Sequence, residues 1–249
     1  DDYVDFGGDE MIGIDTIGIG ETAIYVSFKN GDLKAYGARS WTPPSDLGGR
    51  TIDSLNVAQD FVVAKMSDNT LLAWGDTTKA SLWSPLNGVL GESVSSVATG
   101  DTNNGIVSYT TRKARGFGHV NFVTNVNAIL EEADYTLSDA AIGVDKLLVR
   151  YTSGKLRAWS ITDPNGAATF TELTLPEHLQ NAGIISGRGE VFGIVNTTGY
   201  FYLWGDNAPD IDTEAAGMVD ILSVGSYALV ARDVYNDPDI PYHEVRFTL

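Results

Sequence analysis

The stretch Leu71-Leu72-Ala73-Trp74-Gly75-Asp76 is a short apolar run that ends in tryptophan, glycine and aspartate. An aromatic residue followed by a small residue ends a similar run five times, at Tyr36-Gly37, Trp74-Gly75, Phe117-Gly118, Trp159-Ser160 and Trp204-Gly205. A sixth, weaker copy lies at Arg246-Phe247. Neighbouring aromatic residues are separated by 38 positions (Tyr36 to Trp74) to 45 positions (Trp159 to Trp204). A recurring period of this length predicts a stacked-repeat architecture.

Each repeat reads as a series of short strands rich in β-branched and aromatic residues. In the third repeat we expect strands at Ser93–Thr99, Gly105–Tyr109 and Ala114–Phe117, with an outer strand that begins at Asn121–Thr124. The turns between second and third strands contain residues that tolerate positive φ, such as Asn30-Gly31 and Ser153-Gly154. Beyond short connectors such as Glu131-Glu132, no helical periodicity of useful length is evident.

The first strand of each repeat ends among small residues, as at Gly18 and Gly20 or at Ala98 and Gly100, which indicates crowding around a common axis. A four-stranded sheet cannot bury both of its faces alone, but radial packing covers each face with a neighbour. The sequence therefore predicts an all-β fold, a six-bladed β-propeller of four-stranded antiparallel blades. The aromatic residue at the end of each third strand would then pack between blades rather than bind a ligand.

Ring closure is expected at the N-terminus. The final repeat reaches its third strand at Glu244–Leu249 without a fourth, and the extended stretch Tyr3–Phe6 precedes the first inner strand, Ile12–Ile19. The simplest solution lets the N-terminal stretch supply the outer strand of the last blade, with seven blades as the alternative. We expect a single domain over residues 1–249, with repeat units that end near 37, 75, 118, 160, 205 and 249.

At this point the chain resembles the regulator of chromosome condensation repeat. The pattern runs from a proline through two hydrophobic strands and a turn glycine to Trp-Gly-Asp, and its best copies are Pro44–Asp76 and Pro176–Asn207. The units are divergent and shorter than is usual in that family. The resemblance implies a propeller used as a binding platform, and it assigns no functional residue here.

Composition narrows the set of partners. The 249 residues include 33 acidic and 16 basic side chains, a formal net charge of −17, and no cysteine. An acidic surface repels phosphate backbones, so we expect no nucleic-acid partner. Two clusters of basic side chains are expected to protect sheet edges against pairing with other chains. They are Arg112, Lys113 and Arg115, and, one repeat later, Arg150, Lys155 and Arg157. No apolar run reaches membrane-span length, so no membrane insertion is expected.

The sequence contains few residues arranged for catalysis. His119, His178 and His243 lie in different repeats without metal-site spacing, and no phosphate loop or nucleophile elbow is present. The acidic connector Asp206–Asp212 lacks the glycine and distal glutamate of a calcium loop. We therefore expect no cofactor, no metal and no enzyme activity. A propeller glycosidase would need two carboxylates converging on the axis.

Two departures from the repeat indicate a partner-binding site. The last hairpin, Asp233–Tyr242, is longer than its counterparts, and insertions of this kind often map to the binding face. Its Tyr235, Asp237, Asp239 and Tyr242 are the expected contacts. Trp41 and Trp83 lie beyond the blade aromatics, and two roles stay open for them: outer-strand packing or exposed anchors for a partner.

The sequence favours a non-catalytic propeller that docks proteins as a structural or adhesive module of a larger extracellular or virion assembly. The first residue is Asp1, which fits a processed chain or an excised segment. A regulator that caps a partner enzyme is the first alternative, and a carbohydrate-active propeller is the second.

Overall fold

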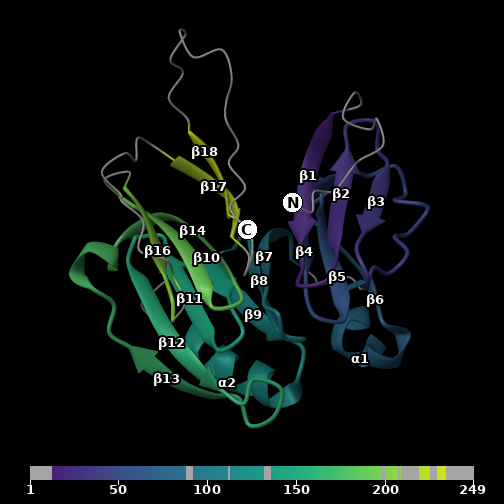
Figure 1. Ribbon diagram of the computed structural model, residues 1–249. Coiled ribbons are helices and arrows are strands. Elements are labelled where there is room, and N and C mark those ends of the chain that lie inside the picture. The colour runs from purple at the N-terminus through teal and green to yellow at the C-terminus, as the bar shows by residue number, and fades with distance from the viewer. Residues whose placement is uncertain are drawn as a thin grey trace, which may run out of the picture.

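The computed structural model describes residues 13–87, 92–111, 113–131, 136–197, 200–206, 208, 219–224 and 229–233. These residues form six small antiparallel sheets, none of which closes on itself (Figure 1). In each sheet the strands follow one another in chain order. The expected all-β class is therefore confirmed.

The strands are short and agree with the repeats read from the sequence. The first three sheets contain β1 (Ile14–Ile19), β2 (Ile24–Phe28) and β3 (Leu33–Tyr36); β4 (Ile52–Val57), β5 (Phe61–Met66) and β6 (Leu71–Gly75); and β7 (Val94–Thr99), β8 (Gly105–Tyr109) and β9 (Ala114–Phe117). The fourth sheet contains β10 (Leu137–Ile142), β11 (Lys146–Tyr151), β12 (Leu156–Thr162) and β13 (Thr169–Leu173). The last two contain β14 (Ala182–Arg188), β15 (Val191–Asn196) and β16 (Phe201–Trp204); and β17 (Val219–Val224) and β18 (Leu229–Asp233).

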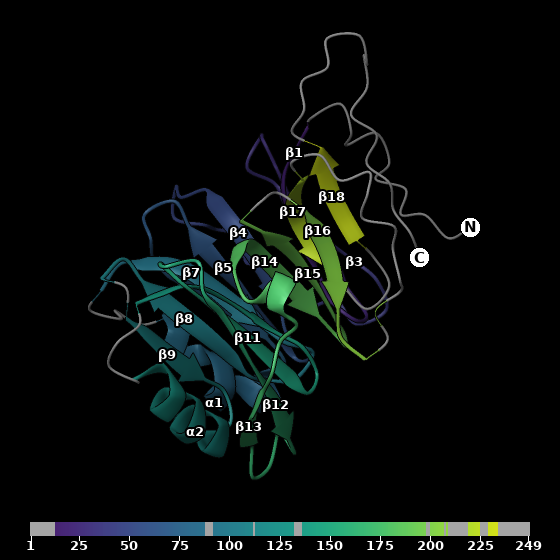
Figure 2. The same cartoon turned by 90° about the vertical axis from the view of Figure 1, so that its left-hand side faces the viewer.

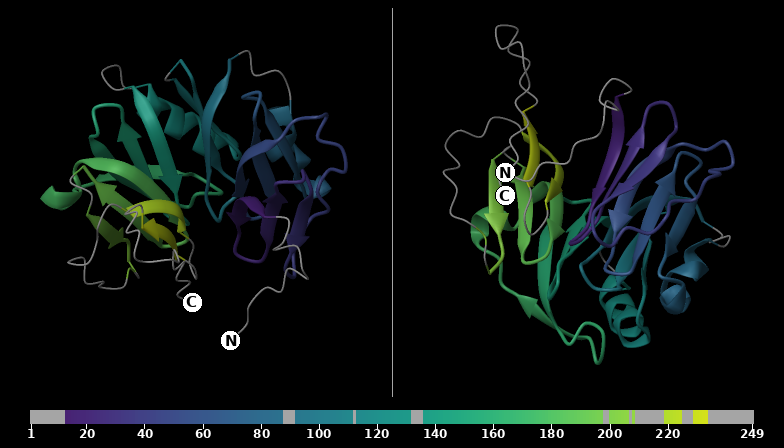
Figure 3. Two further views of the ribbon diagram at one scale, coloured as in Figure 1. Left: turned by 90° about the horizontal axis from the view of Figure 1, so that it is seen from above. Right: turned by 45° about the vertical axis from the view of Figure 1, so that its right-hand side comes forward.

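The sheets are arranged radially, with the first strand of each one innermost. Contacts join β1 to β4, β4 to β7, β7 to β10, β10 to β14 and β14 to β17. Viewed from above, the sheets follow one another around a common axis (Figure 3). A Cβ atom added at Gly18 of β1 would lie 2.6 Å from the Cβ atom of Leu55 in β4. The small residues at the inner strand ends are thus required by close approach of neighbouring sheets.

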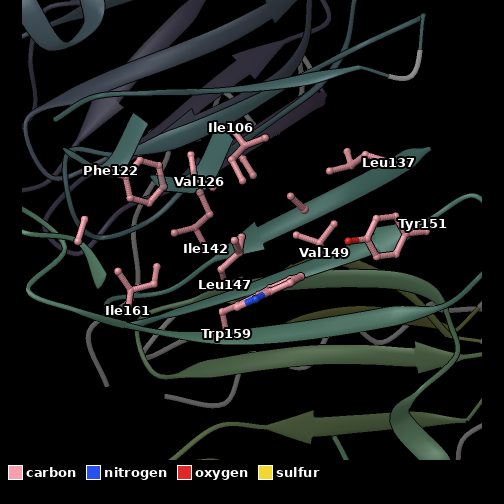
Figure 4. Packing of buried hydrophobic residues seen from close by; sticks show 13 residues of the cluster. Ile106, Phe122, Val126, Leu137, Ile142, Leu147, Val149, Tyr151, Trp159 and Ile161 are labelled. Carbon is pink, nitrogen blue, oxygen red and sulfur yellow. The ribbon is translucent and has the colours of Figure 1, made fainter. Parts of the chain in front are cut away.

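Each hydrophobic core lies between two consecutive sheets, and the strand-ending aromatics fill it. Trp74 of β6 meets Tyr25 of the first sheet edge-on, with ring centroids 5.7 Å apart. Phe117 of β9 packs against Phe61 of the second sheet, with ring centroids 6.1 Å apart. Trp159 of β12 is buried in the core shared by the third and fourth sheets (Figure 4). The expected packing role of these aromatics is confirmed.

The core between the third and fourth sheets shows how the strands interdigitate. Figure 4 shows Trp159 beside Leu147 and Val149 of β11, with Phe122 and Val126 reaching the same core from a helix. All five side chains are at most 4% exposed. Such burial makes this interface a large contributor to stability, because apolar area removed from water is worth about 25 cal/mol per Å².

The prediction of four-stranded blades is wrong for the first three sheets, which have three strands each. Within the described residues, four strands form only in the fourth sheet. In the third sheet, the outer strand expected at 121–124 is instead the helix α2 (Val120–Leu130), which lies along β9 (Figure 2). Phe122 and Val126 are four residues apart and both buried, so they form the inner stripe of that helix.

The other sheets also vary at their outer edges. After β6 come the 3₁₀-helix η2 (Thr77–Lys79), the short helix α1 (Ala80–Trp83) and the 3₁₀-helix η3 (Ser84–Asn87), which contacts β6. A further 3₁₀-helix, η4 (Glu177–Leu179), lies between β13 and β14. No strand forms within residues 37–51, which follow β3. No helix of the described part of the chain is long and apolar enough to cross a bilayer.

The aspartates of the two Trp-Gly-Asp copies make different contacts. Asp206 accepts a hydrogen bond at 2.6 Å from the buried ammonium of Lys146, which lies on β11 of the preceding sheet. Asp76 instead caps η2 by accepting from the backbone N–H of Thr78 at 2.8 Å. One copy therefore ties two sheets together, and the other starts the turn that covers a sheet edge.

Candidate functional site

A β-bulge recurs at the start of the first strand in five of the six described sheets. The pairing register shifts around the second residue of the strand, at Asp15, Asp53, Ser95, Ser138 and Gly183. In β17 the shift falls later, between Ile221 and Ser223. Bulges re-aim side chains and are frequent next to functional sites. Because the bulges recur at the same position of successive first strands, they indicate a candidate functional site at that level of the propeller.

The bulged positions are polar in four of the five sheets. The pairs are Asp15-Thr16, Asp53-Ser54, Ser95-Ser96 and Ser138-Asp139, whereas β14 has Gly183-Ile184. The residue of the second strand that faces the bulge continues this pattern. Ser27, Lys65, Ser108 and Arg150 lie opposite the third residue of their first strands. A polar belt therefore runs through four neighbouring sheets at one level of the axis.

A cavity of about 420 Å³ lies among these inner strands, and we call it the axial cavity. Its wall comes from β1, β4, β5, β7 and β14. Six of its residues carry hydroxyl groups: Thr16, Ser54, Ser95, Ser96, Thr99 and Ser186. Asn56 adds a carboxamide, and Ile17, Leu55 and Val97 supply apolar surface. Its volume falls within the range of about 300–1,000 Å³ that is typical of small-molecule sites.

The charges in the cavity wall are paired. The ammonium of Lys65 donates to Oδ2 of Asp53 at 2.7 Å. The Lys65 side chain is 12% exposed and that of Asp53 is 44% exposed, so the lysine is largely covered while the carboxylate reaches solvent. Among the described residues of the cavity wall, Lys65 and Asp53 are the only charged side chains, so this wall has no net charge.

A second pair occupies the equivalent position in the fourth sheet. Asp139 of β10 lies opposite Arg150 of β11, as Ser54 lies opposite Lys65. Burial raises the pKa of the Asp139 carboxyl to about 6, against the opposing effects of a hydrogen bond from the Ala140 N–H and of the Arg150 charge. That hydrogen bond measures 2.9 Å to Oδ1 of Asp139. Arg150 Nε is buried without a hydrogen-bond partner in the described part of the chain.

Hydroxyl and carboxamide groups prevail among the polar residues of the axial cavity. Each hydroxyl both donates and accepts hydrogen bonds, and Asn56 does so through separate atoms. A glycosidase would need two carboxylates facing one substrate. Of the described residues that line the cavity, only Asp53 is a carboxylate, and Lys65 holds it in an ion pair.

Of the six residues predicted to contact a partner, the structure describes Trp41 and Trp83. Tyr235, Asp237, Asp239 and Tyr242 lie outside the described residues. Trp41 follows β3 and is half-buried on the core between the first two sheets, where its backbone N–H donates to the Tyr25 hydroxyl at 2.7 Å. Trp83 ends α1, packs on the next core, and donates from its indole to the Asp76 carbonyl at 3.2 Å.

Two of the three histidines lie among the described residues. His119 precedes α2, the His178 ring lies 4.8 Å from that of Tyr202, and His243 lies outside the described residues. Where side chains are described, no group of three or more His, Cys, Asp or Glu is arranged to hold a metal. Of the predicted edge cations, Arg157 forms a two-point ion pair with Glu172, at 2.8 and 3.0 Å.

A shallow groove of about 650 Å³ lies beside that ion pair, on the outer edge of the fourth sheet. Here residues 180–182 rejoin the edge of the sheet after the turn at η4, and Leu156 N–H donates to the Gln180 carbonyl at 2.8 Å. The groove contains the Arg157–Glu172 pair within its wall, so its charges are already partnered.

Reasoning from the sequence missed the polar belt, although its signal was present. Each of the first four inner strands begins with an apolar residue followed by two polar ones, as in Ile52-Asp53-Ser54 and Val94-Ser95-Ser96. Two consecutive polar residues break the alternation of a strand, and such a break in several repeats indicates a bulge. The partners Lys65 and Arg150 follow only from the pairing register.

No protein-family model and no curated protein sequence matches this chain. Solved structures do match. The C-terminal domain of gp131 from bacteriophage phiKZ superposes with a TM-score of 0.66 at 10% identity, covering 94% of this chain and 78% of that one. Prp20p from Saccharomyces cerevisiae, the yeast RCC1 protein, gives 0.62 at 13% identity, covering 89% and 70%.

Human WBSCR16 gives a TM-score of 0.59 at 13% identity, covering 78% of this chain and 62% of that one. The chain thus spans less than two thirds of that protein. At such low identities the likeness concerns the fold. The chain has an RCC1-like β-propeller fold, and the resemblance read from its Trp-Gly-Asp repeats is confirmed at this level.

Proposed function

We propose that this chain is a non-catalytic β-propeller that binds protein partners as a structural or adhesive module of a larger assembly. The observation that carries the proposal is the run of inter-sheet cores, which joins five successive sheets into one stiff platform. A stiff scaffold suits recognition through its loops, because loops held by rigid elements lose less entropy on docking.

The structural neighbours support this choice of class. Prp20p was described together with its binding to Gsp1p and histones, which makes it a propeller with protein partners. The gp131 domain belongs to a bacteriophage. A virion or extracellular setting is our proposal for the present chain, in line with its net charge of −17, which disfavours nucleic acid.

We place the docking surface on the end of the propeller where second strands turn into third strands. All sheets repeat the same strand order, so these turns share one end. The described turns are tight, as at Asn30-Gly31, where Gly31 N–H donates to the Phe28 carbonyl at 2.8 Å. The hairpin at residues 233–242 is longer in sequence, and its Tyr235, Asp237, Asp239 and Tyr242 are the proposed contacts.

Trp41 and Trp83 are proposed as secondary contacts at the rim. Both are half-buried and both keep part of an indole surface at the edge of a core. An aromatic side chain that is already ordered by packing costs little entropy when a partner covers the rest of it.

The proposal includes a single domain that closes as a six-bladed ring, with seven blades as the alternative. Five of the contacts between first strands are formed within the described residues, from β1 through to β17. We propose that Tyr3–Phe6 supplies an outer strand to the last blade, and that the repeat units end near residues 37, 75, 118, 160, 205 and 249.

Replacing residues 233–242 by a four-residue Asn-Gly hairpin tests the docking surface. We expect an unchanged circular dichroism spectrum and thermal midpoint, with loss of co-purifying partners from the source organism's particles or cell extract. The matched control is Val144→Ala, which truncates an exposed side chain in the turn between β10 and β11, at the opposite end of the sheets. If the shortened protein retains the same partners at the same yield, the hairpin is a tolerated insertion and the assignment falls.

A further inference from the structure

The axial cavity has a wall whose chemistry matches one class of small ligand. Residues that carry hydroxyl groups line it on four different strands, at Thr16 of β1, Ser54 of β4, Ser96 of β7 and Ser186 of β14. Hydroxyl groups arranged on several sides of a cavity satisfy a ligand that itself presents donors and acceptors in several directions. We propose that the axial cavity binds a neutral polyhydroxy compound, such as a small sugar.

The bulged pairs contribute polar residues to the cavity wall. Asp53 and Ser54 of β4, and Ser95 and Ser96 of β7, all line the cavity at the positions where the pairing register shifts. Because such pairs recur on neighbouring inner strands, this level of the axis is rich in hydrogen-bonding groups.

The charges of the wall favour a neutral ligand. Lys65 and Asp53 neutralise each other at 2.7 Å, so neither is left to hold a counter-ion. The whole chain carries a formal charge of −17, which opposes the approach of an anion. A phosphorylated or carboxylated sugar would therefore lose affinity, because its charge would enter the cavity without a partner.

The wall also contains apolar surface between its polar groups. Ile17, Leu55 and Val97 line the cavity beside Thr16, Ser54 and Ser96. Sugars combine hydroxyl groups with C–H faces, so both kinds of surface find a counterpart. A wall made only of hydroxyl groups would compete poorly with water, whereas burial of the C–H faces adds a favourable hydrophobic contribution.

This site is separate from the proposed protein-docking surface, because it uses the inner strands and the docking surface uses the outer hairpins. Failure of one proposal leaves the other intact. The hairpin replacement described above leaves every residue of the cavity wall unchanged, so it should preserve sugar binding even if it abolishes protein binding.

Saturation-transfer NMR with a panel of glucose, galactose, mannose, N-acetylglucosamine, sucrose and maltose tests the inference. Glucose 6-phosphate and galacturonate serve as charged counterparts, and a neutral Gly-Ser peptide serves as the alternative occupant. We expect at least one neutral sugar to give saturation transfer with millimolar or tighter affinity, and its charged counterpart to give a weaker signal.

Two variants connect the signal to the cavity. Ser54→Phe fills the cavity and should abolish binding, whereas Ser96→Ala removes one hydroxyl and should weaken binding about threefold to tenfold. Thr171→Ala, at an exposed position of β13, is the matched control and should bind as the wild type does. Ser96→Ala keeps the test decisive if Ser54→Phe does not fold.

Three results would overturn the inference: no neutral sugar binds, a charged sugar or the peptide binds more tightly than every neutral sugar, or binding survives unchanged in Ser96→Ala and in a folded Ser54→Phe.

Discussion

Truncation of Trp74 is the sharpest test of the radial packing. Trp74 is 6% exposed and lies between two sheets, where its ring meets that of Tyr25 at a centroid distance of 5.7 Å and an interplanar angle of 75°. Replacing a buried tryptophan by alanine costs about 3–5 kcal/mol through lost burial and the cavity left behind. That loss is about a fifth or more of the total stability of a typical domain, about 5–15 kcal/mol.

The assay is thermal and guanidinium-induced unfolding, followed by circular dichroism and tryptophan fluorescence. For a domain of about 150–250 residues each kcal/mol shifts the melting temperature by about 2–4 °C, so Trp74→Ala should melt about 6–20 °C below the wild type. Trp74→Phe retains a ring against Tyr25 and should recover at least half of the loss.

Trp83→Ala provides the matched control, because Trp83 is half-buried at the end of α1 and lies outside the contact between the first two sheets. It should cost less than Trp74→Ala. The reasoning is refuted if Trp74→Ala keeps the wild-type midpoint, or if it loses partner binding without losing stability, which would make Trp74 a ligand contact.

Two further predictions concern closure and pH. Deleting residues 1–8 should expose an edge of the last blade, lower the melting temperature by several degrees and increase aggregation, and an unchanged melting curve would contradict closure by the N-terminal stretch. Asp139→Asn should stabilise the protein above pH 6. The pKa of the Asp139 carboxyl is raised from 3.8 to about 6 in the folded state, so the folded protein binds this proton more tightly than the unfolded chain does. The free energy of unfolding of the wild type therefore falls as the pH rises from 3.8 to about 6, and the variant avoids this loss. The gain of the variant over the wild type should approach about 3 kcal/mol at pH 7 and vanish below pH 4, and a pH-independent difference in urea unfolding would count against it.

The inner three strands of the first five sheets could be predicted from the sequence because they obey strong local rules. The strands predicted at Gly105–Tyr109 and Ala114–Phe117 have the same bounds in the structure. Turn residues with positive φ and the strand-ending aromatics mark these strands, and packing from both sides admits few other residues. These constraints act on neighbouring residues in the chain and are therefore visible in it.

The element at the outer edge of each sheet was harder to predict, because its side chains pack against the rest of the protein on one side only. At 120–130 the buried pair Phe122 and Val126 fits a helix, but a few apolar residues in a short run also fit a strand. The structure shows that Asn125 helps to fix the helix, since its carboxamide donates to the carbonyl of Ala168, 43 residues further along the chain, at 3.0 Å. No local pattern contains that contact.

The candidate site was visible only in part. The hydroxyl-rich character of the inner strands could be read from residues such as Ser95 and Ser96. The ion pair between Lys65 and Asp53, and the facing of Asp139 and Arg150, depend on how two strands align, and a shift of one residue would change every partner.

The variety of the outer edges has a practical consequence for engineering. One sheet ends in a strand, one in an eleven-residue helix, and one is followed by an irregular stretch at residues 37–51, yet all three keep the same inner strands. The rim therefore accepts unrelated secondary structures without disturbing the cores. The exposed Gly48-Gly49 turn is a suitable insertion point for a fluorescent domain, an affinity tag or a grafted epitope, and such a cargo would project outward from the sheets.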